Sequence, residues 1–262
     1  MNKTGYFPSY ENYVQILKSL KQTEKYMDYS QVQDDTQRFA LLRHDIEFSV
    51  ERAFDMAELE AKHSIYSTYL VQITNNAYNA FSQKNLALLR QMCDMGHHVG
   101  LHFHMGSLTN LEQVVEELPR QAEILSEMLR RPVDRFSFHR PPVEVLRANL
   151  CFSGLINLYD KRFFTFSEHA DTEKDLEVKY ISDSRHQWNF GIPDDKTLQG
   201  CKKVHLLVHP YSWTKEGLSN RDNFESLSRE KVKILLDTFQ SECKHFAAVK
   251  DKLSLTQVLE SN

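Results

Sequence analysis

The sequence lacks the features typical of membrane, disulfide-rich and nucleic-acid-binding proteins. No apolar run approaches the roughly 20 residues that a bilayer-spanning helix needs. The four cysteines are widely spaced and form no C-x-x-C pair, so neither a zinc-finger nor a redox motif is present. The net charge of −4 argues against a polyanionic partner, because phosphates are neutralised by clustered lysine and arginine. We therefore expect no nucleic-acid partner and no membrane span.

Linkers and targeting signals are missing as well. No internal repeat, low-complexity tract or segment rich in proline, glycine and serine marks a domain boundary. We expect a single domain over residues 1–262, with an N-terminal helical extension at about 1–37. The first residues, Met1-Asn2-Lys3, are polar and do not resemble a secretory signal, so we expect a cytoplasmic protein.

What the chain does have is an alternation of short β-rich runs with longer helical ones. This order is typical of parallel strands joined by crossover helices. The expected strands are 39–44, 65–73, 98–103, 135–138, 155–158, 179–181 and 204–208. The expected helices lie within 7–29, 50–63, 81–95, 111–130, 145–150 and 230–241, the second capped by Ser49 and the fourth by Asn110. The pattern predicts one α/β domain.

Polar side chains gather where the expected strands end. In parallel α/β folds these ends meet on one face, so the residues there can assemble a site. The residues concerned are Asp45, Glu47, His102, His104, His139, Arg140 and His209. Side chains two apart on an extended segment point to the same side, so two carboxylates can face two imidazoles. Carboxylate with neutral imidazole suits zinc or a similar divalent ion. The sequence predicts a metal-dependent site built from Asp45, Glu47, His102 and His104.

Four short segments carry these residues in a recognisable order. They read LRHDIEFS at 42–49, GHHVGLH at 96–102, FHRPP at 138–142 and LLVHP at 206–210. The first two resemble the R-H-D-(V/I)-D and G-H-E-(I/V)-G-L-H motifs of the polysaccharide deacetylases (NodB-like, carbohydrate esterase family 4). The likeness is to the branch associated with lipopolysaccharide and O-antigen biosynthesis. The other two are similar to the family's arginine-proline and late leucine-histidine motifs. The resemblance covers roughly residues 38–213.

The resemblance implies a distorted, incomplete (β/α) barrel. It also implies a divalent metal ion, with zinc expected, and hydrolysis of an N-acetyl or related acyl group from a sugar in cell-surface polysaccharide biosynthesis. Asp45 matches the general base and His102 the first metal-binding histidine, while Glu47 stands where the family has a metal-binding aspartate. Arg140 and His209 match the remaining polar positions.

The same resemblance implies that Arg140 keeps the carboxylate of the base ionised and that His209 protonates the leaving amine. Asp183 is expected to pair with one of these two. The expected substrate-binding residues are His44, His139, Arg185, Trp188 and Trp213. The expected partner is an acylated sugar, a sugar nucleotide or a lipid-linked saccharide.

Two departures from the family pattern bear on the site. Glu47 is one methylene longer than aspartate, and Gly106 stands where many deacetylases carry a second histidine, four residues after the first. We expect His104 to replace that histidine, with His139 as the next candidate. Two alternatives stay open: a catalytically degenerate carbohydrate-binding protein on the same fold, and a metal-dependent amidohydrolase acting on another small amide.

Overall fold

The computed structural model describes residues 8–106, 108, 110–165 and 177–252. The chain divides into two compact units, Met1–Leu218 and Ser219–Asn262. The first unit contains all of the candidate site residues. The second contains α7 (Asn220–Glu242) and α8 (Phe246–Val249). The expectation of one domain over residues 1–262 stays a prediction.

The first unit is built on one parallel sheet of seven strands in the order β5-β4-β3-β2-β1-β7-β6. The strands are β1 (Phe39–Ile46), β2 (Thr68–Val71), β3 (His98–His104), β4 (Arg135–His139), β5 (Ile156–Asn157), β6 (Val178–Ser182) and β7 (Lys203–Val208). Within the described residues β5 and β6 are the two edges of this sheet, which does not close on itself. The predicted α/β fold with an incomplete (β/α) barrel is therefore confirmed.

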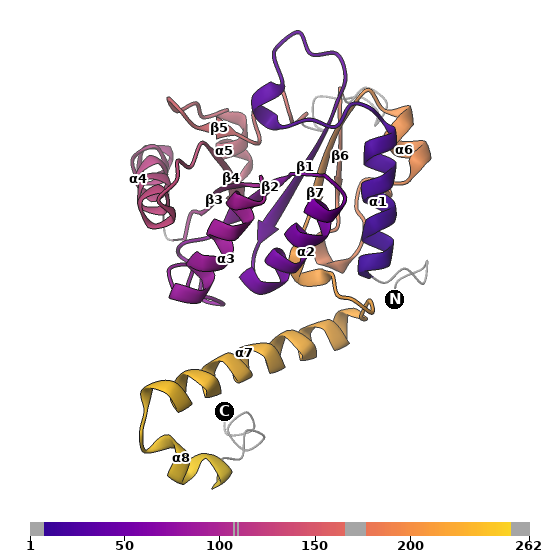
Figure 1. The fold of residues 1–262 in the computed structure, drawn as a ribbon. Coiled ribbons are helices and arrows are strands. Elements are labelled where there is room, and N and C mark those ends of the chain that lie inside the picture. Colours follow the sequence, from indigo (N-terminus) through magenta and orange to yellow (C-terminus); the bar gives the residue numbers. More distant parts are fainter. Residues whose placement is uncertain (1–7, 107, 109, 166–176, 253–262) are drawn as a thin grey trace. The chain divides into compact units, whose positions relative to one another are not determined.

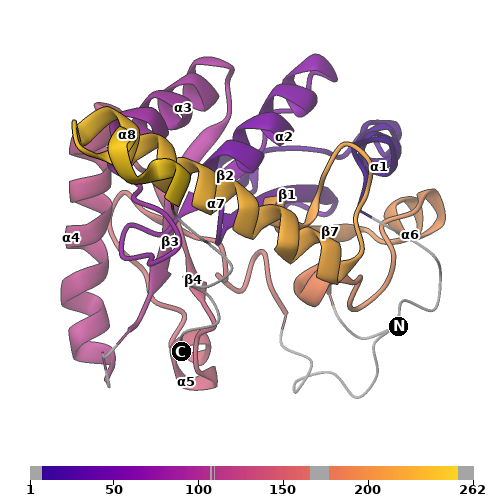
Figure 2. The same cartoon turned by 90° about the horizontal axis from the view of Figure 1, so that it is seen from below.

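Helices connect the strands and lie against the sheet. They are α1 (Tyr10–Gln22), α2 (Val50–Lys62), α3 (Gln83–Asp94), α4 (Leu111–Leu129), α5 (Val143–Arg147) and α6 (Asp195–Gly200). Figure 2 shows α4, α3, α2, α1 and α6 in an arc along one side of the sheet. Among the helices of the described residues, none combines the length and the apolar character that crossing a bilayer requires.

The predicted helix starts at Ser49 and Asn110 are confirmed. The side chain of Ser49 accepts a hydrogen bond from the backbone of Arg52, and that of Asn110 from the backbone of Gln113. Such caps satisfy amide groups that have no partner within the helix. The prediction was incomplete elsewhere: α6 was not expected, and α7 begins at Asn220 rather than at residue 230.

The inner strand β1, which lies between β2 and β7, is buried on both faces along its whole length. Ala40 and Leu42 pack with the apolar residues of α1, whereas Phe39 and Leu41 belong to a separate cluster on the other face. Because successive side chains of a strand point to opposite faces, residues 43 and 45 share the face of Leu41 and residue 44 does not. This alternation decides which residues of the polar segment 43–47 can reach the concave side of the sheet.

A fully buried carboxylate links β1 to its neighbours on the helix-covered side. Glu60 of α2 hydrogen bonds His44 Nε2 at 2.7 Å, Ser67 Oγ at 2.5 Å and Tyr69 Oη at 2.9 Å, and it also accepts the hydroxyl of Tyr13 from α1. Burial raises the pKa of Glu60, but the charge and hydrogen bond of His44 outweigh it and hold the pKa below its usual range. One ionised group thus joins α1, α2, β1 and the segment leading into β2.

Replacing Glu60 with alanine should destabilise the first unit strongly. The change leaves His44 and two tyrosine hydroxyls buried without their acceptor, and breaking a buried pair in this way costs about 3 to 5 kcal/mol. Urea unfolding followed by circular dichroism measures the change in the free energy of unfolding. Glu58→Ala on the same helix is the control, because Glu58 is partly exposed, and we expect a change within about 0.5 kcal/mol. Equal losses in the two variants would contradict the role given to Glu60.

Candidate metal centre

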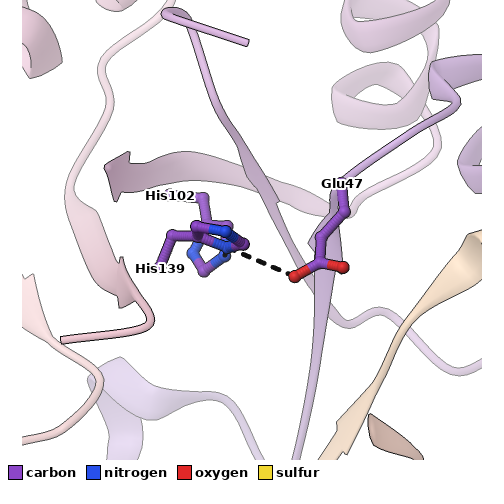
Figure 3. A group of neighbouring side chains, drawn as sticks. All are labelled: Glu47, His102 and His139. Atoms are coloured by element: carbon purple, nitrogen blue, oxygen red, sulfur yellow. Dashed lines mark hydrogen bonds and ion pairs between the residues drawn. The ribbon is translucent and has the colours of Figure 1, made fainter. Parts of the chain in front are cut away.

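Three potential metal ligands meet at the carboxyl end of the sheet. Glu47 follows β1, His102 lies in β3 and His139 ends β4, and their ligand atoms all lie within 4.8 Å of one another. His139 Nδ1 is 3.2 Å from Glu47 Oε1 and 3.3 Å from His102 Nε2. Figure 3 shows the two rings and the carboxylate directed toward one another. Each comes from a different strand, so the sheet itself brings them together.

Neighbouring groups fix these ligands in orientation. His102 Nδ1 hydrogen bonds Ser137 Oγ of β4 at 2.8 Å, which turns Nε2 toward Glu47. The backbone carbonyl of Glu47 accepts from Asn75 Nδ2 at 2.8 Å, and the carbonyl of Ile46 accepts from the Tyr78 hydroxyl at 2.8 Å. The end of β1 is therefore held by two side-chain donors from the segment after β2.

The protonation states suit a cation. Burial, followed by the nearby charges of His139 and Arg43, holds the pKa of His102 well below its ordinary value, so its imidazole is neutral. Burial raises the pKa of Glu47, but the hydrogen bond from His139 and the charge of His209 lower it further, and the net effect is an ionised carboxylate. One carboxylate and neutral imidazole nitrogen form a donor set that fits Zn²⁺ or a similar divalent ion.

His104 does not belong to this group. Its ring lies beside that of His139, with the centroids 5.0 Å apart, and its side chain is only partly buried. Although His104 and His139 are partners in register, the ring of His104 is not among the atoms that converge within 4.8 Å. His139, the second candidate from the sequence, is the residue that lies with Glu47 and His102, and its role as a ligand stays a prediction.

The buried cation beside Asp45 is Arg43. Arg43 Nη2 lies 3.3 Å from Asp45 Oδ2, and both side chains are buried. The sequence predicted that Arg140 is the cation beside Asp45. Arg140 is instead exposed, and its backbone is left-handed, with φ of 47°. Arg43 and Asp45 are two apart on one strand and therefore share its concave face. This spacing was visible in the sequence and could have identified the pair. The same carboxylate oxygen lies 3.6 Å from His102 Nε2.

A histidine–aspartate pair, His209 and Asp183, lies beside the candidate ligand Glu47. His209, which follows β7, places Nδ1 2.6 Å from Asp183 Oδ1, and its Nε2 is 3.9 Å from Glu47 Oε1. Asp183 also accepts hydrogen bonds from the backbone of His209 at 2.9 Å and from Trp213 Nε1 at 2.8 Å. Burial lowers the pKa of His209, but the charge of Asp183 outweighs it and raises the pKa to about 9. His209 is therefore an imidazolium at neutral pH.

Two residues expected to bind substrate are corrected by their burial. His44 is fully buried on the helix-covered face, and Trp213 is fully buried with its indole N–H bonded to Asp183. Neither can contact a sugar. Trp188 is partly buried with its ring 6.0 Å from that of Trp213, while Arg185 is exposed with φ of 63°. For these last two, substrate binding stays a prediction.

Comparisons with known proteins give matches in solved structures alone. No family model matches the sequence, and no curated protein matches it significantly. The chitin deacetylase of the fungal pathogen Colletotrichum lindemuthianum aligns over 74% of this chain and 84% of its own, at 13% identity and a TM-score of 0.38. A mutant of BA3943, a CE4 family pseudoenzyme with restored enzymatic activity, aligns over 84% of this chain and 79% of its own, at 10% identity and a TM-score of 0.44. A family 4 carbohydrate esterase from Bacillus anthracis aligns over 100% of this chain and 97% of its own, at 15% identity and a TM-score of 0.33. At such TM-scores the likeness carries no argument, and the fold is established by the chain's own strand order.

The His209–Asp183 pair predicts a specific dependence of stability on pH. The pKa of His209 is raised from about 6.5 to about 9 on folding, so its stabilising contribution is fully present below pH 6.5 and is lost as the pH rises through 9. The contribution is at most about 3.5 kcal/mol, since the pKa rises by about 2.5 and each pKa unit corresponds to about 1.4 kcal/mol. Urea unfolding at pH 6 and pH 9.5, in the presence of a chelator, measures it. Asp183→Asn should flatten the difference, and an unchanged pH dependence in that variant would refute the pairing.

Proposed function

We propose that this chain is a metal-dependent hydrolase that removes an N-acetyl or related acyl group from a sugar or sugar precursor in cell-surface polysaccharide biosynthesis. The observation that carries the proposal is the convergence of Glu47, His102 and His139. Asp45 lies next to His102 of this group, and the His209 imidazolium lies next to Glu47. Amide hydrolysis needs a base for water, stabilisation of an oxyanion and an acid for the leaving amine, and these groups can supply all three.

In this proposal the three ligands hold a divalent ion, with zinc expected. When bound, such an ion polarises an acyl carbonyl and lowers the pKa of a coordinated water toward about 7. The contribution of the protein is to present one carboxylate oxygen and two imidazole nitrogens from three segments of a rigid sheet. The conformational freedom of two of these ligands is reduced by hydrogen bonds. His102 bonds Ser137, and Asn75 donates to the backbone carbonyl of Glu47.

Asp45 is the proposed general base. Its Oδ2 is occupied by Arg43, whereas its Oδ1 is buried and has no hydrogen-bond partner among the described residues. A buried carboxylate oxygen of this kind is costly unless something donates to it. A water that attacks an acyl carbon would donate its proton to this oxygen.

His209 is the proposed general acid. Asp183 bonds to Nδ1, which leaves the protonated Nε2 facing Glu47 and available to the leaving amine. The nitrogen of a sugar amide becomes a good leaving group only when protonated. A histidine that is protonated at neutral pH before the reaction can supply that proton. Base and acid thus come from two neighbouring strands, Asp45 from β1 and His209 from the end of β7.

The proposed substrate is an acylated sugar, a sugar nucleotide or a lipid-linked saccharide met in the cytoplasm. Its support is the likeness of the motifs at 42–49 and 96–102 to the branch associated with lipopolysaccharide and O-antigen biosynthesis. The polar side chains of the site suit a hydroxylated substrate.

Alanine substitutions should distinguish the proposed metal ligands His102 and His139 from the adjacent His104. His102→Ala and His139→Ala should each lose stoichiometric metal after dialysis against zinc and then against metal-free buffer, because two ligands hold zinc weakly. His104→Ala should retain the metal. This variant is the matched control because it removes an imidazole at the same end of the sheet, from the register partner of His139. Elemental analysis of the dialysed proteins gives the result. Loss of metal from His104→Ala with retention in His139→Ala would reverse the assignment.

Asp45→Asn should keep the metal and lose hydrolysis. Removing a general base typically reduces kcat by about 10²- to 10⁴-fold. A panel of N-acetyl and N-formyl sugars, sugar nucleotides and small amides, assayed by release of the acid, measures this loss. Full activity of Asp45→Asn would refute its role as base. A wild-type protein that binds sugars but hydrolyses nothing would instead favour a carbohydrate-binding protein. Hydrolysis of small amides alone would favour an amidohydrolase of another kind.

A further inference from the structure

We propose that Tyr159 is a positioning residue for the base Asp45 and that it acts through Arg43. This inference rests on the proposed function, because it concerns how the base of that reaction is held. Tyr159 lies two residues after β5, an edge strand, while Asp45 lies in the inner strand β1. No motif of the sequence pointed to Tyr159, and no direct contact between it and Asp45 is needed for the effect.

Arg43 connects the two residues through a single nitrogen. Its Nη2 donates to Asp45 Oδ2 at 3.3 Å and to the hydroxyl oxygen of Tyr159 at 2.8 Å. Nη2 carries two hydrogens, so these two acceptors use both. The remaining guanidinium nitrogens, Nε and Nη1, are buried and have no acceptor among the described residues. The orientation of this fully buried side chain is therefore decided at Nη2.

The ring of Tyr159 restrains the same guanidinium. The Cζ atom of Arg43 lies 4.5 Å from the centroid of the Tyr159 ring, which is within the range of a cation–π contact. The hydroxyl and the ring face thus hold the cation by different interactions. Burial lowers the pKa of Arg43, but Asp45, Tyr159 and Tyr180 raise it further, so the side chain stays charged. A phenylalanine at 159 keeps the ring contact and removes the hydrogen bond alone.

Tyr159 is itself held in place by its surroundings. Its backbone N–H donates to Asn157 Oδ1 at 2.9 Å, and the preceding residue, Leu158, donates from its N–H to the carbonyl of Phe136 in β4 at 2.9 Å. The ring of Phe164 meets that of Tyr159 edge-on, with the centroids 5.1 Å apart. Because its backbone and its ring are both held, Tyr159 can keep the flexible side chain of Arg43 in one orientation.

The consequence concerns which oxygen of Asp45 is free. With Arg43 directed at Oδ2, Oδ1 is left to accept a proton from water. Without the tyrosine hydroxyl, the guanidinium keeps its charge but can turn Nε or Nη1 toward either oxygen. The base is then less often in the productive arrangement, which lowers kcat and leaves substrate binding nearly unchanged.

A double-mutant cycle with active, metal-loaded protein tests this relay. Tyr159→Phe should lower kcat by about tenfold, in line with loss of one hydrogen bond to a charged group, with KM within about twofold and metal content unchanged. In an Arg43→Lys background the further loss from Tyr159→Phe should be less than about twofold, because the shorter ammonium side chain no longer links the two residues. Arg43→Gln is the second background, for use if Arg43→Lys does not fold.

The control is Tyr26→Phe. This hydroxyl donates to the carbonyl of Tyr66 at 3.0 Å, and residue 26 bridges to Ala40 near the amino end of β1, far along the strand from Asp45. Its removal should leave kcat unchanged. Wild-type kcat in Tyr159→Phe, or an equal loss in both backgrounds, would overturn the relay while leaving the proposed function intact. A wild-type protein without metal or hydrolysis would overturn both.

Discussion

The alternation of side chains along β1 is the constraint on which the rest of the site depends. The strand is buried on both faces, so each successive residue must be compatible with one of two different environments. Arg43 and Asp45 occupy the concave face, where they pair with each other, and His44 occupies the helix-covered face, where it meets Glu60. A shift of one residue would bury the base among the helices and move His44 into the site. The register of the neighbouring strands β2 and β7 prevents such a shift.

The buried charges around the site do not cancel. Asp45, Glu47 and Asp183 are carboxylates, and the cations beside them are Arg43 and the His209 imidazolium. Two of the carboxylates have a close cation at 3.3 Å and 2.6 Å, whereas Glu47 lies 3.9 Å from a cation that is already bonded to Asp183. Among these five groups one negative charge is left over, beside the neutral imidazole of His102. Glu47 is only partly exposed, and charge largely removed from water is expensive unless a counter-charge is bound, which a divalent ion supplies.

The sequence predicted those parts of the site that depend on single strands. The positions of Asp45, Glu47 and His102 follow from where strands end, and the pairing of His209 with Asp183 agrees with the expectation that this aspartate meets one of two cations. The parallel α/β fold was likewise predictable from the alternation of strands and helices, and the incomplete barrel from the resemblance of the motifs. For the strand ends and the helix caps the information is local, because neighbouring residues set them.

What the sequence missed depends on distances between strands. The choice of His139 over His104 reflects how far each imidazole reaches across the β3–β4 pair, although the two residues are direct neighbours in register. Likewise, the relay through Tyr159 joins residues 116 positions apart. The early start of α7 was missed because residues 220–229 hold only two apolar side chains, Phe224 and Leu227, which are too few to establish a helical periodicity.

The central claim is that one carboxylate and two histidines from three strands bind a single divalent ion. A crystal structure of the zinc-loaded protein, with data collected on both sides of the zinc absorption edge, tests it directly. The account predicts one anomalous peak within about 2.0 to 2.2 Å of Glu47, His102 Nε2 and His139 Nδ1, with His104 outside that range. A peak coordinated by His104 in place of His139, or no peak at this end of the sheet, would contradict it.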